Sequence, residues 1–319
     1  MNKINVNDYL SNEEIEQFLK KSDWKAAMEF FHTWIWIAFA FAIAGIWPNP
    51  ITIVISMFII GGKQLACAIL MHDCAHRSMF NSKWANNFFG NWFAGYCILH
   101  DVERYRPYHM EHHVKTGTNE DPDLSLTKGY PTTLISFTRK VMRDLGGATG
   151  IKGHISILIM NYGYIKYELG GRIVKTGQQH GFFKGMTTFL KNMTGPVVTN
   201  FMIFGILWLL GESWLYLLWI GSLLTTYNFS LRIRSIAEHS VVPNKFDDYK
   251  NTRTIYANFF ERILFAPHHV NYHAEHHLLM TVPSYNFPSM HCLIKERGFY
   301  KKGLLKKNYI QILKLAIKK

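Results

Sequence analysis

Residues 30–62 read FFHTWIWIAFAFAIAGIWPNPITIVISMFIIGG, a stretch that contains no Asp, Glu, Lys or Arg. It is too long for one ordinary membrane-spanning helix, since about 20 residues cross a bilayer. The segment Trp47-Pro48-Asn49-Pro50 interrupts it, and closely spaced prolines end a helix and force a turn. We therefore predict a helical hairpin whose arms are residues 30–46 and 51–71.

A second pair of apolar segments follows later in the chain. Residues 192–211 and 213–231 carry no charge, and Glu212 stands between them. We predict a second hairpin with arms at residues 194–210 and 213–231. Two buried helices of a soluble protein are the alternative, but soluble core helices rarely come as paired uncharged runs of this length. The predicted fold is all-α: one polytopic membrane domain over residues 1–319, with four transmembrane helices in two hairpins.

The distribution of Lys and Arg predicts the orientation of these helices. The net charge is +13, and we find no nucleic-acid-binding motif, so we expect a membrane surface and not a nucleic acid as the partner. Both hairpin tips lack Lys and Arg, whereas residues 295–319 contain nine basic residues and one acid. The termini and the segment between the hairpins are therefore predicted to be cytosolic. The polar N-terminus shows no cleavable signal peptide, and the compact chain is typical of the bacterial inner membrane.

The segment between the hairpins, about residues 125–190, is harder to place. Residues 132–137 and 155–162 are apolar but short, and they fit helices that lie in the membrane interface. The glycine-rich residues 146–150 resemble a hinge between these helices. The four cysteines form no Cys-x-x-Cys pair and are expected to be buried free thiols: Cys67, Cys74, Cys97 and Cys292.

The histidines gather in three short boxes. Residues 72–76 read HDCAH, residues 109–113 read HMEHH, and residues 273–277 read HAEHH. Positions three or four apart share one face of a helix, so each box points at least two imidazoles in one direction. The boxes all fall on the cytosolic side of the predicted topology, as does a further histidine just beyond the fourth apolar run. A cytosolic helical cap is therefore predicted to hold nine imidazoles: His72, His76, His109, His112, His113, His239, His273, His276 and His277.

This many imidazoles points to a metal centre. Neutral imidazole is a ligand for iron, zinc, copper and nickel. One zinc ion takes about four ligands, so the set is too large for one such ion and suits two. Two iron ions with open positions would activate dioxygen. A histidine-rich zinc transporter is the alternative, but it is expected to place ligands inside the spans or in a loose loop, whereas the predicted spans contain only His32 near one end.

Several other polar residues lie beside the boxes or within a span. The acids next to the histidines are expected to accept a hydrogen bond from the ring nitrogen that faces away from the metal, and a surface salt bridge is the alternative for each: Asp73, Glu111, Glu238 and Glu275. Lys63 lies within the second predicted span, nine residues before His72. A cation inside a membrane is a candidate for contact with the substrate, with a snorkelling or interhelix role as the alternative.

The boxes, the hairpins and their spacing resemble the integral-membrane fatty acid desaturase family, which also contains hydroxylases, ketolases and alkane monooxygenases. The resemblance covers about residues 30–300. Further matching elements are Tyr105-Arg106, residues 118–123 (TNEDPD), Val282-Pro283, Asn286-Phe287-Pro288, His291 and the Arg-x-Arg-x-x-x-Glu-His element that ends at His239.

The resemblance implies a non-haem di-iron centre held by the nine histidines, with O2 as co-substrate. It further suggests that Asn271 holds a metal-bound water and that His291 lies behind the ligands. His268 and His269 match no ligand of the family and are expected at the substrate channel or an interface. The remaining histidines are expected at the surface or at interfaces: His100, His154 and His180.

The function implied is desaturation of a fatty acyl chain. Three residues separate the two histidines of the first box, as in desaturases that act on acyl-lipids. We see no fused haem segment, so an external electron donor is expected, of the ferredoxin, rubredoxin or cytochrome b5 type. A hydroxylase or ketolase on the same scaffold, and a desaturase of a small amphipathic metabolite, remain as alternatives.

Overall fold

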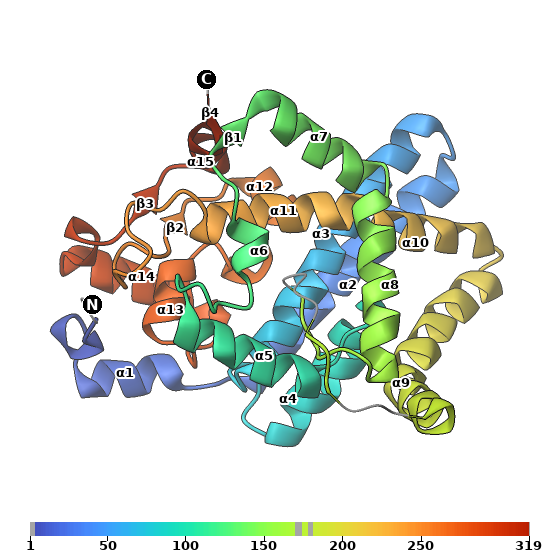
Figure 1. Cartoon of the computed structure of the whole chain (residues 1–319), viewed down its shortest axis with the longest axis horizontal. Helices are drawn as coiled ribbons and strands as arrows, with labels where there is room; N and C mark the ends of the chain where they lie inside the picture. Colours follow the sequence, from blue (N-terminus) through green and yellow to red (C-terminus); the bar gives the residue numbers. More distant parts are fainter. Residues whose placement is uncertain (1–3, 170–173, 178–180, 319) are drawn as a thin grey trace.

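The computed structural model describes residues 4–169, 174–177 and 181–318, which are mostly helical (Figure 1). The α-helices are α1 (Asn12–Leu19), α2 (Asp23–Ile46), α3 (Pro50–Ala75), α4 (Lys83–Gly90), α5 (Val102–Lys115), α6 (Leu124–Thr127), α7 (Leu134–Leu145), α8 (Ala148–Tyr162), α9 (Phe182–Leu209), α10 (Tyr216–Leu224), α11 (Thr226–His239), α12 (Phe259–Leu264), α13 (His273–Leu278), α14 (Phe287–Glu296) and α15 (Tyr309–Ala316). Short helical turns are η1 (Val6–Asp8), η2 (Asn91–Gly95), η3 (Tyr96–Ile98), η4 (Ser213–Leu215), η5 (Pro267–His269), η6 (Ser284–Asn286) and η7 (Phe299–Lys301).

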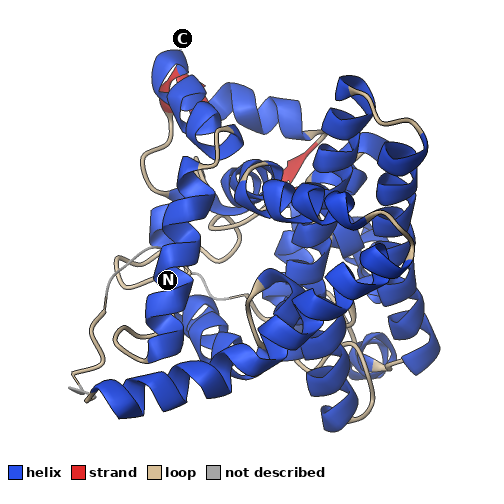
Figure 2. Cartoon of the chain, turned by 90° about the vertical axis from the view of Figure 1, so that its right-hand side faces the viewer, coloured by secondary structure: helices blue, strands red, loops and turns tan. Residues whose placement is uncertain are grey.

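Two pairs of very short parallel strands complete the described structure. Strand β1 (Thr132–Thr133) pairs with β4 (Ile317–Lys318), and β2 (Thr254–Ile255) pairs with β3 (Leu305–Lys306). Figure 2 shows how little of the chain is strand. These pairs tie the C-terminal segment to earlier parts of the chain, so that it packs beside α11.

The first predicted hairpin is confirmed. Helix α2 ends at Ile46, and the side chain of Asn49 accepts hydrogen bonds from the backbone N–H groups of Ile51 and Thr52, which caps the start of α3. Pro50 occupies the first position of α3, where the missing N–H would have no helical partner anyway. The two arms pack along each other over their length.

Helix α3 is the central element of the molecule, and α2, α5, α10, α11 and α12 all pack against it. Two glycines permit this close packing. A Cβ atom at Gly61 would lie 2.3 Å from Oγ1 of Thr226, and one at Gly62 would lie 2.4 Å from the carbonyl oxygen of Ile263. The backbones of α11 and α12 therefore approach α3 closely only because these positions lack side chains.

The second predicted hairpin differs in its last arm. Helix α9 contains residues 194–209 of the predicted arm, but it begins earlier, at Phe182. Residues 213–231 do not form one helix, because Thr225 has non-helical backbone angles between α10 and α11. Helix α10 alone is about 14 Å long, shorter than the roughly 30 Å hydrocarbon core. Of the described helices, three are long and apolar enough to cross a membrane, namely α2, α3 and α9.

The predicted helices of the middle segment are present. Helices α7 and α8 include most of residues 132–137 and all of residues 155–162. The glycine-rich piece lies between them as expected, with Gly147 at a φ of +82°, although α8 already begins at Ala148. Their placement in a membrane interface stays a prediction.

Candidate metal centre

The three histidine boxes lie on short helical segments that meet at one end of α3 (Figure 1). His72 lies in the last turn of α3, and His76 is the residue that ends it. The second box occupies the last turns of α5, and the third box begins α13. His239 is the last residue of α11. The helical spacing of three and four residues turns the imidazoles of each box towards the other boxes.

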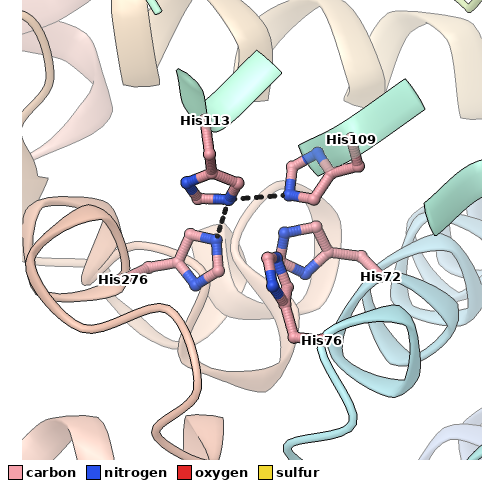
Figure 3. Close-up of side chains that lie close together, drawn as sticks. All are labelled: His72, His76, His109, His113 and His276. Carbon is pink, nitrogen blue, oxygen red and sulfur yellow. Dashed lines mark hydrogen bonds between the residues drawn. The ribbon is translucent and has the colours of Figure 1, made fainter. Parts of the chain in front are cut away.

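The structure brings all nine predicted histidines together in two adjacent clusters. The first cluster, which we call site A, consists of His72, His76, His109, His113 and His276. The second, site B, joins two groups that share His239, namely His112, His239 and His277, and Glu238, His239 and His273. The possible ligand atoms lie within 4.8 Å of one another in the group that forms site A and in each of the two groups that form site B. Figure 3 shows the five imidazoles of site A converging from α3, α5 and α13.

The shortest contacts within the clusters join ring nitrogens to ring nitrogens. Nε2 of His113 lies 2.9 Å from Nε2 of His109 and 3.0 Å from Nε2 of His276. In site B, the Nε2 atoms of His239 and His273 are 2.9 Å apart. His113 also lies beside site B, since its ring centre is 4.6 Å from that of His277. The two sites therefore lie next to each other, with His113 between them.

These contacts fit a metal better than a hydrogen-bond network. Buried Nε2 atoms of His72, His76 and His277 have no hydrogen-bond partner among the described residues. Unpaired buried polar atoms are rare, and these lie among the clustered imidazoles, where a metal ion would pair with them. All the nitrogens are candidates for the same kind of ion, one that prefers imidazole.

The protonation states agree with this interpretation. Burial, and then the charge of neighbouring imidazoles, holds the pKa values of His109, His276 and His277 well below the usual range. Burial likewise lowers the pKa of His76 to about 3 and that of His113 to about 2. These rings are therefore neutral at pH 7, which is the form that binds a metal.

Carboxylates and a carbonyl orient several of the rings from behind. Nδ1 of His72 donates to Oδ1 of Asp73 at 2.7 Å. Nδ1 of His239 donates to the carbonyl oxygen of Asn251 at 3.1 Å. Such contacts fix the tautomer and leave Nε2 free to face a metal.

Three acids lie near site B, namely Asp121, Asp123 and Glu238. Nδ1 of His112 donates to Oδ1 of Asp121 at 2.8 Å. Burial lowers the pKa of His112, but the carboxylates of Asp123 and Asp121 outweigh it, so the net shift is upward. Oε1 of Glu238 accepts a hydrogen bond from Nε of Arg234 at 2.6 Å and lies 3.6 Å from Nδ1 of His273.

The other predicted acids have different surroundings. Glu275 is fully buried, and it accepts a hydrogen bond from Nδ1 of His291 at 2.5 Å as well as bonds from Tyr300 and Thr254. It anchors the helix that carries the third box. Glu111 instead pairs with Lys115 at 2.9 Å on the exposed side of α5, which matches the surface salt-bridge alternative.

The remaining predicted residues lie around or away from the clusters. Asn271 is buried and donates to the carbonyl of Ile255 at 2.8 Å, while its Oδ1 has no hydrogen-bond partner in the described structure. Lys63 is buried in the middle of α3. His100 is buried and not superficial, with Nδ1 2.9 Å from the Tyr167 hydroxyl.

Three of the cysteines are buried free thiols as expected, whereas Cys292 is a free thiol on the surface. His154 is half-buried, and its Nδ1 donates to the carbonyl of Gly150 at 2.8 Å. His180 lies outside the described residues.

Sequence reasoning missed the contacts made by Asp121, Asn251, Thr254 and Tyr300. Only Asp121 had a usable signal, because it belongs to the TNEDPD stretch that resembles the desaturase family. A backbone carbonyl such as that of Asn251 carries no sequence signal. Thr254 and Tyr300 reach Glu275 only through the tertiary fold.

Comparison with known proteins agrees with this geometry. A sequence profile described as fatty acid desaturase matches residues 44–308, which include all three boxes and His239. An sn-1 oleoyl-lipid 12-desaturase of Picosynechococcus sp. is 23% identical over 252 residues, 75% of this chain and 68% of that protein. The dihydrorhizobitoxine desaturase of Bradyrhizobium elkanii is 29% identical over 254 residues, 74% of this chain and 65% of that protein.

A third relative is the fatty acid desaturase 2-like protein of Mus musculus, 24% identical over 278 residues, 77% of this chain and 50% of that protein. The chain spans about two thirds of the length of the first two relatives and half of this one. The family match extends over most of the chain and includes the residues that form both clusters. The chain therefore belongs to the fatty acid desaturase family, a family of oxidoreductases.

Proposed function

We propose that the protein is a membrane-bound, non-haem di-iron desaturase that uses O2 to introduce a double bond into a fatty acyl chain of a lipid. The observation that carries this proposal is the meeting of nine histidines in two adjacent clusters. The family match and the relatives named as oleoyl-lipid desaturases support the reaction and the substrate class.

Site A and site B would each hold one iron ion. The two irons, when bound, would supply the activation of O2 and the removal of hydrogen from an unactivated methylene. Over the whole reaction, two adjacent methylenes lose one hydrogen atom each. O2, two electrons from the donor and two protons then yield an alkene and two waters.

The chain's own residues hold the geometry for this chemistry. Asp73, Asp121 and the carbonyl of Asn251 fix the tautomers of His72, His112 and His239, so that their Nε2 atoms face inward. Burial keeps water from most of the ligand set, because the described ring atoms of both clusters are largely enclosed.

The orientation proposed is the one predicted from the charges. Helices α2, α3 and α9 would cross the membrane, with α10 and the first part of α11 as a fourth, interrupted apolar arm. The histidine clusters would then lie on the cytosolic side of a bacterial inner membrane. There a soluble donor of the ferredoxin, rubredoxin or cytochrome b5 type would deliver electrons, and the basic cytosolic surface would attract an acidic carrier.

A specific observation favours a second substrate class. The relative with 29% identity is named a dihydrorhizobitoxine desaturase, and that name does not mention a lipid. Desaturation of a small amphipathic metabolite is therefore the second candidate. A hydroxylase or ketolase would use the same clusters and differ only in the product.

The test is a mass-spectrometric profile of acyl chains in a host that expresses the intact protein or the variant His276→Ala. The matched control is His154→Ala, which removes an imidazole outside both clusters. We expect a new unsaturated chain with the intact protein and the control variant, and none with His276→Ala.

Iron content of the purified protein separates the other outcomes. Two bound irons without a new unsaturated acyl chain would favour the small metabolite as the substrate. A hydroxylated acyl chain would show that the protein is a hydroxylase. Bound zinc without iron and without oxygen consumption would contradict the di-iron proposal and favour a metal transporter.

A further inference from the structure

A polar cleft lies away from the histidine clusters, between the first half of α2, the middle of α3 and the segment formed by α12 and η5. Its volume is about 420 Å³, at the small end of the range for ligand sites. Its polar and aromatic lining includes Glu29, His32, Trp36, Lys63, Arg262 and His269. We propose that this cleft binds the anionic head group of an amphipathic molecule, a carboxylate or phosphate on an apolar chain, through Lys63 and Arg262.

The main support is the isolation of Lys63. Its side chain is only 2% exposed, yet it lines the cleft. Among the residues that the structure describes, its Nζ makes no hydrogen bond or ion pair, and its contact is a cation–π one, 5.5 Å from the ring centre of Trp36. A buried ammonium group in a helix apolar enough to span a membrane is costly without a counter-ion. An anion from outside the chain would supply that counter-ion.

The acid in the cleft is already engaged. Oε2 of Glu29 accepts a hydrogen bond from Nδ1 of His268 at 2.5 Å, and Nε2 of His268 lies 2.8 Å from the Thr33 hydroxyl. His268 and His269 both have positive φ angles, 49° and 60°, which residues with a side chain seldom adopt. Glu29 lines the same cleft as Lys63 and acts on it as a favourable charge at longer range, but no described hydrogen bond or ion pair joins the two.

The same backbone conformation presents a further polar atom. Nδ1 of His269 is buried and has no hydrogen-bond partner within the described part of the chain. Because His269 lines the cleft, this unpaired nitrogen belongs to the same lining as Lys63. The unpaired groups of Lys63 and His269 together distinguish this cleft from a site where one buried lysine has only a packing role.

The cleft is separate from the metal centre. Nine residues separate Lys63 from His72, which is two and a half helical turns, so the two side chains lie on opposite faces of α3 and about 13 Å apart along its axis. A ligand in the cleft therefore contacts α3 on the side that does not carry the first histidine box.

The mouth of the cleft suits an amphipathic ligand. Arg262 is exposed, and Phe259 lines the same cleft with 62% of its surface exposed, next to the equally prominent Phe260. Aromatic and basic residues side by side are typical of the membrane–water boundary. The head group would enter past Arg262 to Lys63, while the apolar chain would stay against the aromatic side chains.

The test measures binding, so its outcome does not depend on the proposed desaturase activity. Full-length protein in a neutral maltoside detergent is titrated with radiolabelled tetradecanoate and, separately, with tetradecanol, which has the same chain without the charge. We expect tetradecanoate to bind at least about tenfold more tightly, because a charge-assisted bond to a buried cation is lost in the alcohol.

Lys63→Met should abolish this preference, and the apolar side chain of similar volume should be tolerated because no hydrogen-bond or ion-pair partner is left behind. Arg262→Gln at the exposed mouth should weaken the preference as well, and it serves as a second variant should the first fail to fold. The control is Lys152→Met, an exposed lysine on α8 outside the cleft. Unchanged iron content and melting temperature show that the variants are folded.

Competition then identifies the source of the ligand. Displacement of tetradecanoate by phosphatidylglycerol, but not by phosphatidylcholine, would mean that an anionic bilayer lipid occupies the cleft. Displacement by fatty acids alone would mean a carboxylate. Equal binding of tetradecanoate and tetradecanol, or a preference that survives both substitutions, would overturn the proposal.

Discussion

The Nε2 atoms of His113 and His276 lie 3.0 Å apart, although 163 positions separate the two residues in the sequence. His113 belongs to site A, and its ring is also 4.6 Å from that of His277 in site B. His113 therefore occupies the boundary between the two clusters. A residue in this position should affect both metals, whereas a residue confined to one cluster should affect one.

We predict that His113→Ala lowers bound iron at both sites, whereas His239→Ala lowers it at site B alone. The physical reason is that His239 contributes only to groups within site B. Metal analysis of the purified proteins should give close to no iron for the first variant and about half the wild-type amount for the second. Equal loss in both variants would contradict the division into two sites.

A second prediction concerns the two acids near the second box. Asp121→Asn should weaken iron binding about 10- to 100-fold, since Asp121 orients the imidazole of His112 from 2.8 Å. Glu111→Gln is the matched control. It removes a surface pair with Lys115 that contributes at most about 1 kcal/mol, so iron binding should hardly change. Iron competition with a chelator measures both, and a larger effect of Glu111→Gln would refute the assignment.

The same two acids show why part of the site was predictable and part was not. Helical spacing predicted that the imidazoles of each box share a direction, and the clusters agree with it. Glu111 stands beside His112 in the sequence, but one residue on a helix means a turn of about 100°, so its side chain faces outward. Asp121 reaches the ring only because the loop after α5 folds back, and loop conformation has no periodic signal.

The interrupted fourth arm has a similar explanation. Residues 213–231 lack charge, so their hydropathy predicts one helix, but Thr225 and Thr226 lie in the middle of them. Oγ1 of Thr226 donates to the carbonyl of Met57 at 2.6 Å on α3. This tertiary contact accompanies the break between α10 and α11. The absence of charged residues, on which the prediction of one helix was based, does not reveal such a break.

A third prediction follows from the close packing on α3. Gly61→Ala places a methyl group 2.3 Å from Oγ1 of Thr226 and 2.7 Å from the backbone nitrogen of Tyr227. The backbone must shift, so we expect a loss of about 1–3 kcal/mol or more in stability. Gly205→Ala in α9 meets nothing within 4 Å and should stabilise by up to about 1 kcal/mol. Melting temperatures in detergent test this, and similar effects of the two changes would argue against the packing described.

A fourth prediction is that the metal-free protein loses stability as the pH falls. Burial lowers the folded-state pKa values of His76 and His239 to about 3 and that of His113 to about 2. Below the unfolded value near 6.5, the unfolded chain therefore binds protons that the folded chain does not. Between its folded and unfolded pKa values, each such ring lowers the free energy of unfolding by up to about 1.4 kcal/mol for every unit by which the pH falls.

Other groups act in the opposite direction, among them Glu238 and His112. Burial raises the pKa of Glu238 to about 7, and the net shift of His112 is upward, so both bind protons more readily in the folded state. They are outnumbered by the rings with lowered pKa values. We expect a lower melting temperature for metal-free protein at about pH 5.5 than at about pH 7.5, and a smaller difference once iron is bound. A higher melting temperature at the lower pH would contradict the balance of these shifts.

The last prediction concerns the support of His239 at the end of α11. Arg253 is 1% exposed, and its guanidinium donates to the carbonyls of Ala237 at 3.0 Å, Ser240 at 2.6 Å and Val241 at 3.1 Å. The Ala237 carbonyl lies in the last turn of α11, where carbonyls lack helical partners, and Ser240 and Val241 directly follow the helix. Arg253→Met should cost about 3 kcal/mol or more, because buried bonds to a charged donor contribute about 1.5–3 kcal/mol each.

Arg253→Lys keeps the charge but not the planar fork, so it should satisfy fewer carbonyls and give an intermediate stability. If Arg253 also positions His239, both variants should lose iron from site B before site A at temperatures where the protein is still folded. Iron content measured below the melting transition separates this effect from simple unfolding. Full iron occupancy in a destabilised but folded Arg253→Met protein would mean that the guanidinium stabilises the helix end without positioning the ligand.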